Sequence, residues 1–489
     1  MADNLLDALI VGAGLSGIGA AAEIRRQFPS KKIAILESRE RLGGTWDLFR
    51  YPGVRSDSDM YTLGYKARPW RKAQSIVDGP SILRYLRETA EESGVASIIQ
   101  YGKRVRSADW ASDRCEWIVT VRSADGTSNT LRSKFLYLCT GYYSYTEAYR
   151  PNFDGEADFR GQIIHPQFWP ESLDYSGKRV VVIGSGATAV TLVPALAEKA
   201  AHVTQLQRTP SYVVNQPGYD PWARALGKIL PAALIYPLVR WKHILISSLF
   251  YKMARKYPRQ FGARLVELAA TELPKDFDTR KHFKPAYNPW DQRVCAAPDG
   301  DIFREIRKGR VSVVTDTIDR FVPEGIRLAS DAVLPADIVV TATGLKVQPL
   351  GDIQVSLDGK AADFTDTMVY RGAMLSSIPN LVLTFGYTNA SWTLRADLIA
   401  AYVCRLLRHL DRHGLDYAMP VRDSSVGEMP FIDFNSGYVL RALDRLPKQG
   451  DRFPWRVHQT YLRDLGVTRF SKLTDPALKF GRAQKRDAA

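Results

Sequence analysis

The sequence has few cysteines, and they are not paired. It contains four among 489 residues: Cys115, Cys139, Cys295 and Cys404. No two of them have the C-x-x-C spacing that zinc ribbons and dithiol redox centres use, and no disulfide framework is encoded. The pattern excludes these classes, predicts no metal site and favours a reducing cytoplasm.

Long apolar runs are also missing. The longest candidate stretch, residues 229–239, is far shorter than the roughly 20 residues that a membrane-spanning helix needs. The apolar opening carries Asp7 where a secretion signal would have lysines, and it runs directly into a glycine motif. We therefore expect a cytoplasmic protein without a spanning segment.

Acidic residues are scarce relative to basic ones. The chain has 67 Lys and Arg against 52 Asp and Glu, a net charge of +15, and residues 224–264 hold 9 basic residues and no acidic one. Such a balance favours anionic partners: phosphorylated cofactors, nucleic acid or anionic lipid. No nucleic-acid motif is present, so no nucleic-acid partner is predicted. For residues 224–264, a helical lid with a solvated basic face and peripheral contact with the inner membrane face both stay open.

Two strand, glycine turn, helix and strand units are present, at residues 7–37 and 178–208. They predict an α/β protein with two doubly wound, Rossmann-like dinucleotide-binding domains and a helical insertion. The predicted first domain comprises residues 1–142 and 345–489, the second 143–213 and 293–344, and the insertion 214–292. Residues 142–149 are expected to form a crossover linker.

The first unit carries the G-x-G-x-x-G fingerprint at Gly12, Gly14 and Gly17. The first glycine permits a tight turn, the second lets the backbone approach a pyrophosphate, and the third allows close packing of helix on strand. Glu37 ends the next strand, where a carboxylate can bind a ribose without a 2′-phosphate. This unit predicts a site for FAD or NAD.

The second unit has Gly184, Gly186 and Ala189 at the same positions, but its following strand ends in Arg208 and Thr209 instead of an acid. A guanidinium can pair with a 2′-phosphate, and a hydroxyl can add a hydrogen bond. The unit therefore predicts NADPH as the second cofactor. Two dinucleotide sites with different ribose chemistry indicate electron transfer from NADPH to a bound flavin.

A third motif, F-x-G-x-x-x-H-x-x-x-W-P, lies before the second unit, at Phe159, Gly161, His165, Trp169 and Pro170. Residues 43–57 read G-G-x-W-x-x-x-x-Y-P-G-x-x-x-D, and residues 342–344 read A-T-G. With these motifs the whole chain resembles the type I Baeyer-Villiger monooxygenases of the flavin-containing monooxygenase superfamily. Residues 50–65, 282–295 and 386–398 resemble the mycobacterial ethionamide-activating branch of that family.

The resemblance implies an NADPH- and O2-dependent enzyme in which a peroxide formed at the flavin C4a position attacks ketones. The products would be esters or lactones, and thioethers or thioamides would be oxidised as well. Arg293 resembles the active-site arginine of the family, and Asp57 resembles the carboxylate that positions it. The alternatives are an N- or S-oxidising flavin monooxygenase without ketone activity, and a membrane-surface or nucleic-acid-binding protein that uses the folds as a scaffold.

The resemblance also implies cofactor contacts. Several family members have a lysine before the active-site arginine, whereas this sequence has Gln292, so NADP selectivity would rest on Arg208 and Thr209. His165 is expected to couple the domains, and the helix that begins near Ser391 is expected to point its N-terminus at the flavin. Further cofactor-binding residues are expected at Ser16, Thr45, Trp46, Asp47, Leu48, Arg55, Ser56, Asp57, Val105, Ser185, Ala187 and Thr188.

Overall fold

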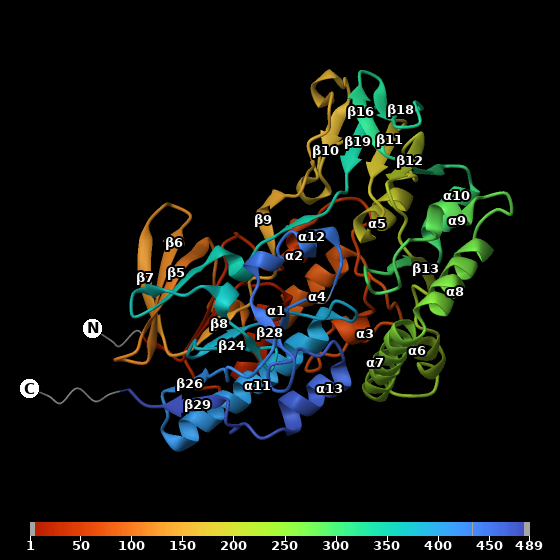
Figure 1. Cartoon of the computed structure of the whole chain (residues 1–489). Coiled ribbons are helices and arrows are strands. Elements are labelled where there is room, and N and C mark those ends of the chain that lie inside the picture. The colour runs from red at the N-terminus through yellow and green to blue at the C-terminus, as the bar shows by residue number, and fades with distance from the viewer. Residues whose placement is uncertain (1–4, 433, 484–489) are drawn as a thin grey trace, which may run out of the picture.

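The first glycine motif lies on a seven-stranded sheet in the computed structural model, which describes residues 5–432 and 434–483 (Figure 1). Its strand order is β23 (Val369–Tyr370), β24 (Met374–Leu375), β25 (Leu381–Leu383), β8 (Leu136–Leu138), β2 (Ala8–Val11), β3 (Ile33–Leu36) and β4 (Ile99–Gln100). Five consecutive strands pair in parallel, and β24, the second strand from one edge, pairs antiparallel with both of its neighbours. The central strands β8, β2 and β3 are continuous apolar runs, as expected where both faces of a sheet are covered.

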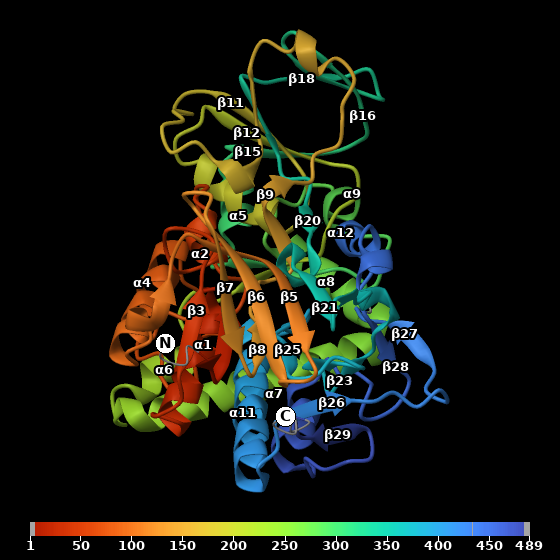
Figure 2. The same ribbon diagram turned by 90° about the vertical axis from the view of Figure 1, so that its left-hand side faces the viewer.

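Helices cover one face of this sheet and a second sheet covers the other. The helices are α1 (Leu15–Gln27), α4 (Gly79–Glu92) and α11 (Trp392–His413). The covering sheet, seen face-on in Figure 2, has the order β1 (Leu5–Leu6), β7 (Ser128–Ser133), β6 (Glu116–Ser123), β5 (Lys103–Ala111), β21 (Gln354–Leu357) and β22 (Lys360–Ala361).

The second glycine motif lies on a separate, fully parallel sheet of five strands. Their order is β10 (Gln162–Ile164), β19 (Ile338–Thr341), β11 (Arg179–Ile183), β12 (His202–Gln207) and β15 (Val311–Thr315). One face packs on α5 (Ala187–Leu196) and α10 (Asp301–Arg307), and the other on β16 (Ile318–Val322), β17 (Gly325–Leu328) and β18 (Val333–Pro335). The two predicted Rossmann-like folds are confirmed.

The chain passes between the two sheets twice, and the two passages pair with each other. Residues 143–148 form strand β9 (Tyr143–Ala148), which lies antiparallel to β20 (Leu345–Val347). Residues 142–149, predicted as a crossover linker, do connect the two sheets, and in addition most of them form a paired strand. Two neighbouring extended segments satisfy their backbone N–H and C=O groups by pairing, and a single sequence pattern does not reveal that partner.

Helices dominate the insertion within the second fold. They are α6 (Pro221–Leu226), α7 (Ala232–Lys256), α8 (Pro258–Thr271) and α9 (Thr279–Phe283), and β13 (Val213–Gln216) pairs with β14 (Cys295–Pro298) on either side of them. Helix α7 packs against α3 (Met60–Leu63) of the first fold. Among the helices of residues 5–432 and 434–483, none is long and apolar enough to cross a membrane.

The C-terminal part returns to the first fold. Helix α11 begins one residue after Ser391, close to the predicted start, and packs along α1. The helices and strands that follow it are β26 (Tyr417–Pro420), β27 (Glu428–Pro430), α12 (Gly437–Leu440), β28 (Lys448–Gly450), α13 (Tyr461–Leu465) and β29 (Leu478–Gly481). The two ends of the predicted first domain, residues 1–4 and 484–489, lie outside the described residues.

Candidate functional site

Both glycine motifs open onto one cavity of about 910 Å³. Its wall comes from both folds, from the β9–β20 connection and from the loop before β14. Ligand pockets in proteins have volumes of this order. Predicted cofactor residues that line it are Gly14, Ser16, Thr45, Trp46, Arg55, Ser56, Asp57, Gly184, Ser185, Gly186, Ala187, Thr188, Arg208 and Thr209.

The first glycine loop has the geometry that a pyrophosphate requires. Gly12 has φ +104°, and a Cβ there would lie 2.5 Å from the carbonyl oxygen of Cys139. A Cβ at Gly17 would overlap the carbonyl oxygen of Gly12, so the helix can approach the strand only without a side chain. Gly14 lines the cavity directly before the first turn of α1, where free backbone N–H groups favour an anion. The loop therefore fits a dinucleotide.

Glu37 lies behind this loop. Its buried carboxylate accepts hydrogen bonds from the backbone N–H groups of Ala13 (2.8 Å) and Arg39 (2.9 Å). Glu37 thus fixes the glycine loop, a role that its position at the end of a strand did not reveal. Whether it also binds a ribose stays a prediction, because Glu37 is not part of the cavity wall as described.

The second glycine loop resembles the first, because its first glycine also lies too close to a backbone carbonyl for a side chain. A Cβ at Gly184 would lie 2.5 Å from the carbonyl oxygen of Ala342, whereas a Cβ at Gly186 would meet nothing within 4 Å. The open side of Gly186 faces the cavity at the start of α5. Arg208 follows β12, is exposed and lines the cavity, and Ser185 Oγ donates to the carbonyl oxygen of Thr209 (2.8 Å). Ala189 is buried under the loop. This arrangement fits a second dinucleotide.

Three other predicted contacts lie away from the cavity wall as described. Asp47 and Leu48 belong to α2 (Thr45–Leu48), and the buried Asp47 carboxylate pairs with Arg39 at 2.7 Å and Arg50 at 3.2 Å. Val105 is buried in β5 opposite Val121. The structure therefore brings Thr45 and Trp46 to the cavity but turns the Asp47 carboxylate toward arginines.

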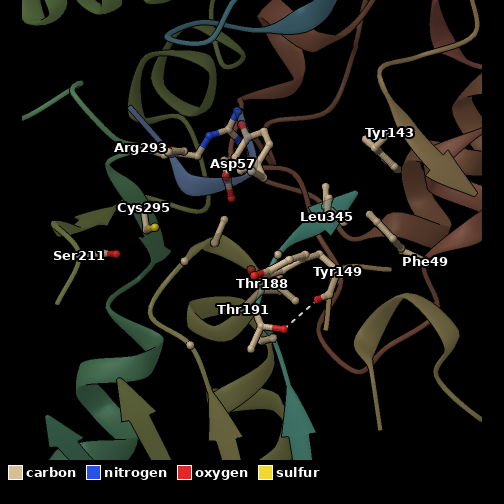
Figure 3. A pocket seen from close by; sticks show the side chains of 18 of the residues that line it. Phe49, Asp57, Tyr143, Tyr149, Thr188, Thr191, Ser211, Arg293, Cys295 and Leu345 are labelled. Carbon is tan, nitrogen blue, oxygen red and sulfur yellow. Dashed lines mark hydrogen bonds and ion pairs between the residues drawn. The ribbon is translucent and has the colours of Figure 1, made fainter. Parts of the chain in front are cut away.

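Arg293 and Asp57 meet in the cavity, and Figure 3 shows their side chains pointing toward each other. Arg293 Nη1 lies 3.1 Å from Asp57 Oδ2. Arg293 is 43% exposed, and this surface belongs to the cavity wall. Burial acts to lower the pKa of the guanidinium, but the combined charges of Asp57, Tyr438, Tyr142 and Cys295 raise it more, so the pKa lies above its ordinary value. Arg293 therefore carries a permanent positive charge into the cavity.

The segment that carries Asp57 is held by the second fold. Gly53 has φ +75°, and a Cβ there would lie 2.7 Å from Ala195 Cβ and 2.8 Å from the carbonyl oxygen of Thr191, both on α5. Arg55 forms an ion pair with Asp301 of α10. Because the same segment follows α2 of the first fold, the position of Asp57 depends on how the two folds meet.

Aromatic residues that were not predicted complete the wall. Tyr142 stacks on Trp392 (ring centroids 5.4 Å apart, 15° between planes), and Tyr438 lies 6.4 Å from Tyr142. The Arg441 guanidinium lies 3.4 Å above the ring of Tyr149. Tyr142 follows the end of β8, a position at the carboxyl edge of a sheet that could have indicated a site. The segment of Tyr438 and Arg441 carries no comparable signal.

Helix α11 begins at the cavity. Its N-terminus is predicted to point at the flavin, and such a contact requires this position. Trp392, its first residue, lines the cavity, and its Nε1 donates to Ser16 Oγ at 2.8 Å. This hydrogen bond joins the C-terminal part of the chain to the first glycine loop. The flavin contact of the helix N-terminus stays a prediction.

The third motif, residues 159–170, lies outside the cavity wall as described and braces the connection between the folds. His165 Nδ1 accepts a hydrogen bond from the backbone N–H of Gln167 (3.2 Å), and Gln167 Nε2 donates to the carbonyl oxygen of Ser144 in β9 (2.8 Å). Burial lowers the pKa of His165, which favours its neutral form. Domain coupling by His165, together with Phe159, Gly161, Trp169 and Pro170, stays a prediction. Within residues 5–432 and 434–483 no group of three His, Cys, Asp or Glu residues could hold a metal ion.

Known proteins resemble the chain over almost its whole length. Residues 73–233 match the flavin-binding monooxygenase-like family, and residues 10–76 match the NAD(P)-binding Rossmann-like domain. The FAD-containing monooxygenase EthA of Mycobacterium tuberculosis (strain H37Rv) is 53% identical over 479 residues, 98% of each chain. EthA of Mycolicibacterium smegmatis is 50% identical over 476 residues, 97% of this chain and 96% of that protein.

A solved structure shares the fold. The crystal structure of OTEMO in complex with FAD and NADP (form 1) superposes with a TM-score of 0.73 at 20% identity, covering 97% of this chain and 99% of that chain. The chain therefore belongs to the flavin-binding monooxygenase-like family, and the relatives that it matches over almost their whole length are FAD-containing monooxygenases.

Proposed function

We propose that this flavin monooxygenase is a Baeyer-Villiger enzyme. In that reaction a ketone, O2, NADPH and a proton give an ester or lactone, NADP⁺ and water. The proposal rests on one observation: the Arg293–Asp57 ion pair lines the cavity that both glycine loops share.

The sheets support a proposal for the two cofactor domains. We propose that residues 1–142 and 345–489 bind FAD, and that residues 143–213 and 293–344, interrupted by the insertion 214–292, bind NADP. The first glycine loop, which has Glu37 behind it, suits the unphosphorylated ribose of FAD, although Glu37 also holds the loop itself. The second, followed by exposed Arg208, suits the 2′-phosphate of NADPH.

When bound, FAD supplies the redox chemistry: it takes a hydride from NADPH and activates dioxygen for insertion into the substrate. The contribution of Arg293 is electrostatic. Oxygen insertion next to a carbonyl develops negative charge on oxygen, and a cation that is already in place stabilises this charge without reorganisation. Arg293 does not lose its proton at working pH, because the ordinary pKa of a guanidinium is already far above neutral. Asp57 is a positioning residue, since its carboxylate holds the guanidinium.

The aromatic wall would exclude water and accept an apolar substrate. Tyr142, Trp392 and Tyr438 all line the cavity, and Tyr142 and Tyr438 lie close enough to Arg293 to affect its pKa. Such a wall fits ketones with apolar substituents and also thioethers or thioamides. The alternative function is N- or S-oxidation without ketone activity, for which a fixed cation beside the substrate is not needed.

The test is a product assay on purified enzyme that contains FAD. Linear, cyclic and aryl ketones, a thioether and a thioamide are each incubated with NADPH and air, and the products are identified by mass spectrometry. We expect esters or lactones from at least one ketone class. We further expect Arg293→Ala to reduce ester formation by about 10²- to 10³-fold while flavin reduction by NADPH changes less than about twofold.

The matched control is Arg327→Ala. Arg327 is 42% exposed and pairs with Asp319 at 2.7 Å, much as Arg293 pairs with Asp57, but it lies on β17, outside the cavity wall. This variant should keep full activity. Oxidation of the sulfur compounds alone, with no ketone converted, would favour the alternative, and normal ester formation by Arg293→Ala would refute the role of Arg293.

A further inference from the structure

Helix α7 lies at the edge of the molecule (Figure 1). Several of its large apolar side chains are exposed. We call these residues the apolar stripe; they are between 43% and 61% exposed and are Leu234, Leu238, Trp241, Leu245, Ile246 and Leu249. Most are three or four positions apart, which places them on one side of a helix. A contiguous exposed apolar surface of this kind marks an interaction site.

Two charged side chains in the middle of the same helix are directed to buried or partly buried partners. Arg240 is 6% exposed, donates to the carbonyl oxygens of Tyr61 (2.7 Å) and Gly64 (2.8 Å), and pairs with Asp397 at 3.2 Å. Lys242 forms an ion pair with the buried Asp220. A surface helix normally has the opposite arrangement, with charges outside and apolar residues inside. Exposure of the outer face of α7 to solvent is therefore unfavourable.

Basic residues lie at both ends of the apolar stripe. Arg224 and Lys228 are exposed before α7, and Lys252 and Lys256 are exposed in its last turns, with no acidic residue from 224 to 264. Exposed aromatic residues accompany them: Trp222 is 57% and Tyr257 41% exposed. Helices that lie in a membrane surface combine an apolar face with basic and aromatic flanks.

We propose that the outer face of α7 lies in the surface of an anionic lipid bilayer. The apolar stripe enters the boundary between headgroups and acyl chains, and the basic residues at both ends contact lipid phosphates. A second copy of the chain fits less well. Because both ends of the stripe are basic, either direction of helix pairing would place like charges opposite one another.

The inner face of α7 connects this surface to the cavity wall. Ile244 packs with Tyr387 and Leu394, and Tyr387 lines the cavity. In the membrane-bound enzyme, only α7 and one layer of side chains would thus separate the cavity from the bilayer.

The first experiment is vesicle flotation of the FAD-containing enzyme. Vesicles of phosphatidylcholine alone are compared with vesicles of phosphatidylcholine and phosphatidylglycerol in a ratio of about 7:3, at about 50 and about 500 mM NaCl. We expect binding to the anionic vesicles at low salt, weaker binding to the neutral ones, and partial loss at high salt, since salt screens the basic residues but not the apolar stripe.

Variants separate the two contributions. Leu245→Glu combined with Leu249→Glu should lower binding to anionic vesicles at least about tenfold. Lys252→Glu combined with Lys256→Glu should remove the preference for phosphatidylglycerol. Val333→Glu is the matched control, because Val333 is 40% exposed and lies on β18, remote from α7 (Figure 1). FAD content and NADPH oxidation should stay unchanged in all of them.

Three outcomes would overturn the proposal. The first is wild-type enzyme that stays unbound with both kinds of vesicle. The second is unchanged binding in the Leu245→Glu, Leu249→Glu variant. The third is an unbound wild-type dimer, measured by light scattering, that this variant converts to a monomer, which would assign the apolar stripe to a second copy of the chain.

Discussion

Asp57 and Arg293 stand 236 positions apart in the sequence and form an ion pair of 3.1 Å in the cavity. Asp57 lies on a segment that α5 and α10 hold in place through Gly53 and Arg55. Arg293 lies in the loop before β14, at the end of the helical insertion. The charge that we propose for oxygen insertion thus requires both folds to be assembled.

Asp57→Asn should lower ester formation by about 10- to 100-fold, less than Arg293→Ala, because the cation stays but loses its orientation. The proportion of NADPH consumed to give hydrogen peroxide instead of ester should rise. The double variant should be no worse than Arg293→Ala alone if the two residues act as a unit. Additive losses of ester formation would show that Asp57 acts independently of Arg293.

Gly53→Ala should destabilise the protein by about 1–3 kcal/mol and reduce ester formation, because the new Cβ collides with α5 and displaces Asp57. Gly177→Ala is the control. Gly177 has φ +67°, but a Cβ there meets nothing within 4 Å, so only backbone strain is added. Thermal unfolding and product assays compare the two. Equal effects would mean that the contact between Gly53 and α5 is unimportant.

Arg208→Ala should raise KM for NADPH by about 10- to 100-fold and change KM for NADH less than about twofold, because only NADPH has the 2′-phosphate. Steady-state NADPH and NADH oxidation measures this. Arg179→Ala, at an exposed ion pair with Asp337 in the same fold, should change neither value. A parallel rise for both nucleotides would assign Arg208 to a structural role.

Asp220→Asn should lower the free energy of unfolding at pH 7 by about 3–5 kcal/mol, because Lys242 would lose its buried partner. Burial disfavours the charged form of Asp220, but hydrogen bonds from His243, Lys242 and the Ala223 backbone lower its pKa more. The folded pKa lies below the unfolded value of about 4, so the carboxylate stabilises the protein above that pH and this contribution is lost as pH falls below it.

Denaturant unfolding from pH 7 to about pH 3 tests this, and the Asp220→Asn curve should be flatter on the acid side than that of the wild type. Asp337→Asn is the control. Hydrogen bonds from Arg179 lower the pKa of Asp337 to about 2, but its side chain is 36% exposed, so the loss should stay below about 1 kcal/mol. Parallel acid-side curves for wild type and Asp220→Asn would contradict the prediction.

The sequence by itself determined the two nucleotide folds and most of their loops. A glycine turn between a strand and a helix is local, and its backbone geometry depends on residues that are neighbours in the chain, such as Gly12, Gly14 and Gly17. For the same reason the residues after each second strand, Glu37 and Arg208, could be located without a structure. The family motifs added Arg293 and Asp57, but not their distance.

The tertiary structure alone decided the rest of the site. The pairing of β9 with β20 and the wall of Tyr142, Tyr438 and Arg441 join segments that are far apart in the chain, so no local pattern encodes them. The charge count in residues 224–264 indicated a basic surface, yet α7 buries Arg240 and exposes Leu245. Which side of a helix faces outward depends on where its polar groups find partners, and here Asp397 and Asp220 lie inside.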